Sequence, residues 1–79
     1  MKVKFLNKNT ILMNAKDNFA IVKWMMEHDY EHPFSNDVNV FMKSYAVRKE
    51  LLENQKFRHD YVDQFVEDLI SNKVIEILK

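Results

Sequence analysis

The 79-residue sequence contains no glycine, and this absence restricts both the turns and the binding chemistry of the chain. The Walker phosphate loop and the dinucleotide-binding fingerprint need glycine where backbone approaches phosphate, so both motifs are excluded. A turn that requires a positive φ must instead use Asn or Asp, which tolerate that region next best. Five asparagines stand where turns are expected: Asn7, Asn9, Asn14, Asn54 and Asn72.

The composition is typical of a globular protein that folds as a single compact domain, residues 1–79. Hydrophobic residues make up 47% of the chain, which is enough to build a core. Twelve basic side chains balance twelve acidic ones, so the net charge of zero provides no general attraction to nucleic acid or to an anionic membrane. Without cysteine there is no disulfide, no thiolate nucleophile and no Cys-based zinc site.

No segment has the pattern of a membrane span or a targeting signal. The longest apolar run, residues 19–22, is four residues long, whereas a bilayer span needs about 20. Polar residues 7–9 interrupt the N-terminal segment before a signal-peptide core can form. We therefore expect a soluble, cytoplasmic protein without membrane contact.

The two ends of the chain have the pattern of β-strands. Val3 and Phe5 alternate with lysines, residues 7–9 are turn formers, and residues 10–13 are β-prone, which together predict an N-terminal hairpin. Residues 73–79 are rich in β-branched side chains, which favours a closing strand paired with the hairpin. The alternative for this last segment is a continuation of the preceding helix.

A first helix is predicted over residues 19–28, with Asp17 or Asn18 as its N-cap. Seven of its eight residues between positions 19 and 26 are apolar. A helix that is apolar nearly all round is buried on more than one side. We therefore expect this helix to lie inside the domain.

A second helix is predicted to begin at Ser35 or Asn36, with Asp37 in its first turn, and to end near Asn54. At 100° per residue its apolar side chains fall on two opposite faces. One face carries Val38, Phe41, Met42, Tyr45 and Leu52, and the other carries Val40, Val47 and Leu51. A helix on the surface of a monomer needs only one apolar face. The second face is therefore either sandwiched inside the domain or in contact with a partner.

A third helix, capped by Asp60, has the clearest amphipathic pattern in the chain. Its apolar side chains recur at helical spacing: Tyr61, Val62, Phe65, Val66, Leu69 and Ile70. The complete prediction is an α+β fold of order β-β-α-α-α-β, in which a small antiparallel sheet made of the N-terminal hairpin and the C-terminal strand packs against three helices.

The titratable side chains do not form a recognisable catalytic or metal-binding motif. His28 and His32 have the i, i+4 spacing of metal ligands, but Pro33 and the polar run 27–32 indicate that the helix does not continue to His32. His59 is adjacent to Asp60, and adjacent residues rarely orient one another for catalysis. We expect surface histidines, no metal, no cofactor and no enzymatic activity.

Charge is segregated along the chain even though it cancels in total. The segment 43–58 has an excess of three positive charges, whereas the segments 17–37 and 60–68 each have an excess of four negative charges. The basic segment could contact nucleic acid through Lys43, Arg48, Lys49, Lys56 and Arg58. The two acidic segments would repel phosphate, so nucleic-acid binding is the alternative rather than the leading hypothesis.

The leading hypothesis is a small non-catalytic protein–protein interaction module, acting as a homodimer or on another protein. The candidate partner-binding residues are Val40, Val47, Leu51 and Trp24, since aliphatic and aromatic side chains predominate in the centres of interfaces. Residues with AT-rich codons greatly outnumber those with GC-rich codons. This skew suggests an AT-rich genome, such as that of a low-GC bacterium, a plasmid or a phage. Our specific hypothesis is a regulator or inhibitor of a host protein, encoded by a phage or mobile element, and the alternative is a chromosomal accessory protein.

The interpretation of the histidines predicts that added Zn²⁺ or Ni²⁺ leaves the melting temperature unchanged. A bound metal stabilises the native state by mass action, so even a modest site would raise the melting temperature at saturating metal. Calorimetry with and without metal measures this. A rise of many degrees that His28→Ala or His32→Ala abolishes would contradict the prediction.

Overall fold

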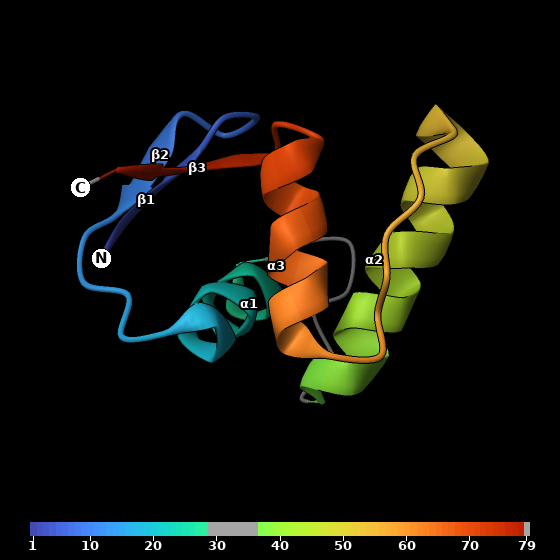
Figure 1. Ribbon diagram of the computed structural model, residues 1–79, viewed down its shortest axis with the longest axis horizontal. Helices are drawn as coiled ribbons and strands as arrows, with labels where there is room; N and C mark the ends of the chain where they lie inside the picture. The colour runs from blue at the N-terminus through green and yellow to red at the C-terminus, as the bar shows by residue number, and fades with distance from the viewer. Residues whose placement is uncertain (29–36, 79) are drawn as a thin grey trace.

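The computed structural model describes residues 1–28 and 37–78 of the chain. Along the chain the elements are β1 (Lys2–Phe5), β2 (Thr10–Leu12), α1 (Asn18–Glu27), α2 (Val38–Glu53), α3 (Val62–Ser71) and β3 (Ile75–Leu78). This order, β-β-α-α-α-β, confirms the predicted α+β class (Figure 1).

The three strands form one antiparallel sheet in the order β2-β1-β3. Val3 pairs with Leu12 of β2 on one side and with Ile77 of β3 on the other, and Phe5 pairs with Ile75. Val3, Phe5 and Ile75 are buried on the face that the helices cover. The C-terminal segment is therefore the predicted closing strand, and the alternative of a continued helix is wrong.

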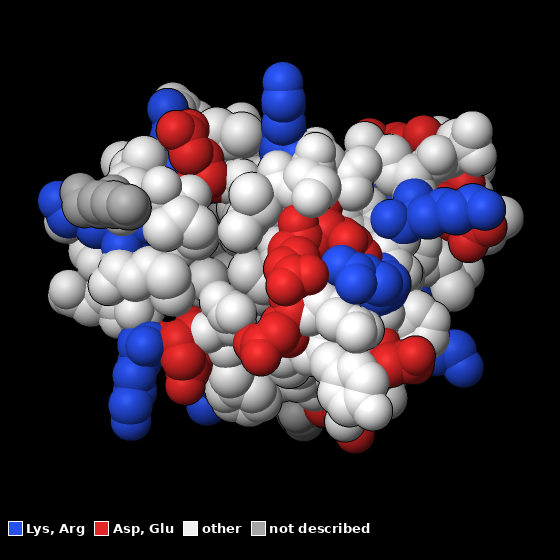
Figure 2. All heavy atoms as spheres, in the orientation of Figure 1, with Lys and Arg blue, Asp and Glu red and all other residues white. Residues whose placement is uncertain are grey.

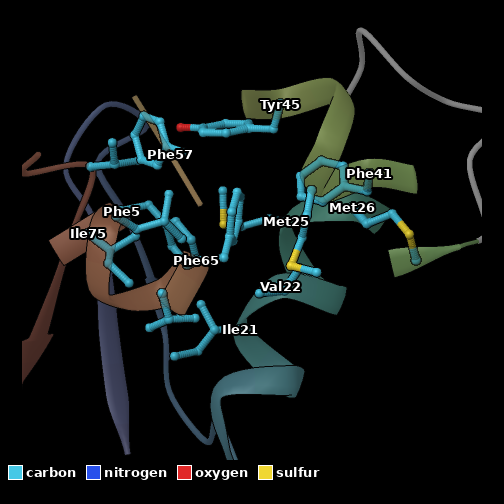
Figure 3. Close-up of a cluster of buried hydrophobic side chains, with 14 of the residues drawn as sticks. Phe5, Ile21, Val22, Met25, Met26, Phe41, Tyr45, Phe57, Phe65 and Ile75 are labelled. Carbon is cyan, nitrogen blue, oxygen red and sulfur yellow. The ribbon is translucent and has the colours of Figure 1, made fainter. Parts of the chain in front are cut away.

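A cluster of aromatic rings joins the helices around Phe65 of α3 (Figure 3). The ring of Phe65 lies 5.5 Å from Tyr45 and 6.5 Å from Phe41, both of α2, measured between centroids. Phe57, in the segment between α2 and α3, lies 6.1 Å away. Offset and edge-on aromatic pairs at these distances add to the free energy of burial, so Phe65 is the point where these segments are held together.

The first two helices begin at aspartate caps. The Oδ1 atom of Asp17 accepts a hydrogen bond of 2.9 Å from the backbone N–H of Ala20, as predicted. At the start of α2, the Oδ1 atom of Asp37 accepts one of 2.8 Å from the N–H of Asn39. Asp37 is thus the cap itself, and the predicted caps at positions 35 and 36 lie outside the described residues.

Among the described residues, three have a positive φ: Asn9, Asn54 and Lys73. The two asparagines are among those predicted for such turns, and Asn54 ends α2 in the left-handed conformation while its N–H donates to the carbonyl of Glu50. Lys73 has a φ of 58° at the turn into β3, whereas its neighbour Asn72, the predicted turn residue, has a φ of −91°. A residue with a Cβ atom is less stable than glycine in this left-handed conformation.

The apolar face of α3 is narrower than the sequence suggested. Phe65 and Leu69 are fully buried, whereas Tyr61 is 67% exposed and Ile70 is 42% exposed. Tyr61, rather than Asp60, is the N-cap residue, and no side chain makes a capping hydrogen bond at this end of the helix. The buried residues of α3 are therefore limited to Phe65, Val66 and Leu69.

We expect Phe65→Ala to reduce the free energy of unfolding by about 3–5 kcal/mol, because it removes a buried ring and leaves a cavity. A domain of this size has little more than that to lose. The variant should therefore be largely unfolded at room temperature in a denaturant titration followed by circular dichroism. A melting temperature close to that of the wild type would contradict the central position of Phe65.

Candidate interaction surface

The second apolar face of α2 lies in solvent. Its members, which we call the α2 stripe, are Val40, Val47 and Leu51, and they are 53%, 46% and 79% exposed. The side chains of α2 that do enter the core are on the opposite side of the helix: Phe41, Met42, Tyr45 and Ala46. The stripe is therefore not sandwiched between elements of the chain.

The last seven residues of α2, from Val47 to Glu53, contribute no buried residue to the core. Ala46 is the last buried side chain of this helix, and the residues from Val47 to Glu53 are half-buried or exposed. Leu52, which helical spacing placed on the core face, is 79% exposed. The prediction for Leu52 is wrong because the core ends before the last turns of the helix. Figure 1 shows α2 at the edge of the molecule, away from the sheet.

The structure places Trp24 apart from the α2 stripe. Its half-buried ring packs against the core, stacked 4.5 Å from Phe5 on one side and 4.0 Å from His28 on the other. The Nδ1 atom of His28 lies 2.8 Å from the carbonyl oxygen of Trp24, which holds the imidazole over the indole. Three of the four predicted partner-binding residues are thus exposed on α2, whereas the fourth, Trp24 of α1, is half-buried and packs against the core.

Arg58 is held by the acidic side chains of α3. Its Nε and Nη2 atoms donate to the two carboxylate oxygens of Asp68 at 3.1 and 3.0 Å, and Nη2 also donates to Glu67 at 3.1 Å. The backbone N–H of Arg58 donates to Asp68 Oδ2 at 2.7 Å. This ion pair was not predicted from the sequence, although the basic segment 43–58 lies next to the acidic segment 60–68.

Two of the other predicted nucleic-acid contacts, Arg48 and Lys49, lie against Tyr45 of α2. The guanidinium of Arg48 and the ammonium of Lys49 lie 5.6 and 5.5 Å from the ring centroid of Tyr45, and Lys49 forms a 2.6 Å ion pair with Glu53. The two remaining cations are exposed: Lys43 and Lys56. Figure 2 shows acidic side chains gathered over α3, whereas the basic ones lie separated from one another, partly on this face and partly at its outline. The five cations therefore form no continuous basic patch there.

A pocket of about 280 Å³ lies between α2, α1 and the turn that joins β1 to β2. Its lining residues combine an apolar floor with a charged rim: Phe5, Asn7, Lys8, Met25, Phe41, Tyr45, Arg48, Lys49, Leu52, Glu53 and Val74. Lys49 and Glu53 of this rim are paired with each other. In addition, the ammonium of Lys8 donates to the carbonyl of His28 at 3.1 Å.

The acidic side chains of α3 connect segments of the chain to one another. Besides the contacts to Arg58, Asp63 accepts a hydrogen bond of 2.9 Å from the side chain of Asn18 at the start of α1. His59 lies 4.0 Å from the carboxylate of Asp60 at the surface. Within residues 1–28 and 37–78, no three His, Cys, Asp or Glu side chains are grouped so that they could hold a metal ion, and His32 lies outside this range.

The chain matches no protein-family model, no curated protein and no solved structure at a significant level. In the described part of the chain, no helix combines the length and the apolar character required to cross a bilayer. Evidence for the function therefore comes from the exposed side chains of the α2 stripe.

The Arg58 guanidinium, through its hydrogen bonds, lowers the pKa of Asp68 below the ordinary value of 3.8. A carboxyl group with a lowered pKa in the folded state stabilises the fold above its unfolded pKa, and this contribution is lost as the pH falls through the folded value. We expect Asp68→Asn to melt at a lower temperature than the wild type at pH 7. The difference should shrink below about pH 4, where the unfolded chain begins to bind the proton, and should vanish once the pH is below the lowered pKa of Asp68 in the folded state.

Thermal melts of both proteins between pH 2 and pH 7 measure this difference. Asp63→Asn is the matched control, since it removes a carboxylate of α3 that does not contact Arg58. Parallel stability curves for the wild type and Asp68→Asn over this whole range would show that the pair does not stabilise the fold.

Proposed function

We propose that this protein is a small non-catalytic protein–protein interaction module that binds its partner through the α2 stripe. The observation that carries the proposal is the C-terminal end of α2 beyond Ala46, which adds Val47 and Leu51 to the surface and no buried residue to the core. A helix extended beyond the part that the fold needs presents a surface for another molecule.

The physical basis is the apolar surface that association would remove from water. Isolated exposed apolar residues are ordinary on protein surfaces, but the residues of the α2 stripe are all aliphatic and share one helix face. Burial of the remaining exposed part of each side chain contributes about 1 kcal/mol, from about 25 cal/mol per Å² of apolar surface. Three such side chains together favour a specific contact between helices.

The alternative, a regulator that binds nucleic acid through the basic segment, has weaker support. Two of its five cations, Arg58 and Lys49, are already engaged by carboxylates. The proposal of a cytoplasmic regulator or inhibitor of a host protein, from a phage or mobile element, rests on the absence of cysteine and on the excess of residues with AT-rich codons. Capture of the partner from the source cell identifies its class.

We expect Val47→Glu to weaken association with a partner or with a second copy by more than about tenfold, equivalent to about 1.4 kcal/mol. The substitution would bury an unpaired charge in the complex, but in the isolated chain the glutamate stays in water. Sedimentation and capture from an extract of the source cell measure association, and circular dichroism measures folding.

Ile11→Glu is the matched control, because Ile11 is 47% exposed, close to the 46% of Val47, and lies on β2 away from α2. This control should keep the association of the wild type. A folded Val47→Glu protein with unchanged mass and unchanged captured partners would refute the proposal. A gel shift that weakens steeply with salt would instead support the nucleic-acid alternative.

A further inference from the structure

The α2 stripe becomes a continuous seam when Ser44 is included with it. Val40, Ser44, Val47 and Leu51 follow one another at intervals of four, three and four residues, the spacing of the seam in a coiled coil. At 100° per residue these four positions lie within about 60° of one another. The half-buried Ser44 is the smallest of them and leaves room for a larger side chain opposite.

Two opposite charges border this seam on the same side. Lys43 and Glu50 are both exposed and lie within about 20° of each other around the helix axis. They are seven residues, or about 10 Å, apart along the axis, which is too far for a contact within one helix. In the described part of the chain neither of them forms an ion pair.

Symmetry decides which arrangement of two α2 helices satisfies these charges. In an antiparallel pair of helices related by a perpendicular two-fold axis, the same border of the seam lies side by side in the two copies. Lys43 of one copy then faces Glu50 of the other, and this ion pair forms twice. In this register Val40 lies opposite Leu51 and Ser44 lies opposite Val47. Parallel helices would instead bring Lys43 against Arg48 of the other copy, which is a repulsive pair.

We infer that the partner on the α2 stripe is α2 of a second copy of this chain, packed antiparallel across a two-fold axis. The inference rests on the proposed function and specifies its partner. Homodimers with two-fold symmetry are the commonest closed assemblies, and such an interface needs only one self-complementary surface. A 16-residue helix is about 24 Å long, so the contact is near the small end of specific interfaces and the dimer is concentration-dependent.

The test exchanges the two charges and measures self-association of the full chain by sedimentation equilibrium, from about 10 µM to 1 mM protein. K43E makes the border of the seam entirely acidic, and E50K makes it entirely basic. Each variant alone should associate at least about tenfold more weakly than the wild type, because like charges then face each other twice. The double variant K43E/E50K should return to within about threefold of the wild type.

A mixture of equal amounts of the K43E and E50K proteins gives the sharpest outcome. The acidic border of one chain then faces the basic border of the other at both sites, so two proteins that are separately monomeric should form a heterodimer. Circular dichroism checks that each variant is folded, as we expect from the exposed positions of both side chains.

Three results would overturn the inference: a wild-type protein that remains monomeric at about 1 mM, a double variant that associates as weakly as the single ones, or a mixture that stays monomeric. The proposed function fails on a different result, namely association and capture that Val47→Glu leaves unchanged. A monomeric wild type that captures another protein only when Val47 is intact would refute the homodimer and keep the interaction module.

Discussion

The position of α2 against α3 depends on the aromatic cluster around Phe65. The ring of this residue on α3 meets Phe41 and Tyr45 of α2, and Phe57 of the following segment also joins the cluster. The part of α2 held in this way is its first half, since burial ends at Ala46. The cluster therefore fixes the direction of α2 and leaves its second half outside the core, where the exposed stripe continues.

The pair between Arg58 and Asp68 complements the aromatic cluster from the surface. Phe57 enters the core, and the next residue along the chain is bound to α3 through its backbone N–H and its guanidinium. The segment that follows α2 is thus fastened at two adjacent residues, one by apolar burial and one by charge. The same contact engages Arg58, one of the cations that could have contacted phosphate. The fold itself therefore weakens the nucleic-acid alternative.

Much of this architecture could be predicted from periodicity because each pattern reports a local contact with the core. The alternation of Val3 and Phe5 identified a strand, and the spacing of Phe65 and Leu69 identified the buried side of a helix. Leu52 shows where this reasoning ends, because helical spacing gives a direction around the axis but not the length over which the core covers it. The left-handed conformation of Lys73 also had no signal in the sequence, since lysine is not a residue that favours it.

The candidate surface could be predicted in part for the same reason. Periodicity separated Val40, Val47 and Leu51 from the core face of α2, and the structure places all three in solvent. It could not separate Trp24, because a half-buried aromatic residue that packs inside the domain has the same local sequence as one that contacts a partner. Ser44, Glu50 and the role of Asp68 were missed, although the spacing of Ser44 within the stripe is readable from the sequence alone.

Among the described residues, no polar or charged residue is buried in the core. The core is therefore held by the shape and apolar surface of its side chains, and charge is left to determine contacts at the surface. On α3 the carboxylates make such contacts within the chain: Asp68 accepts hydrogen bonds from Arg58, and Asp63 accepts one from Asn18. On α2 the charges of Lys43 and Glu50 border a seam whose side chains are half-buried or exposed: Val40, Ser44, Val47 and Leu51. The side chains of this seam and those that enter the core lie on opposite faces of the same helix, so we expect a substitution on the seam to change association without loss of the fold.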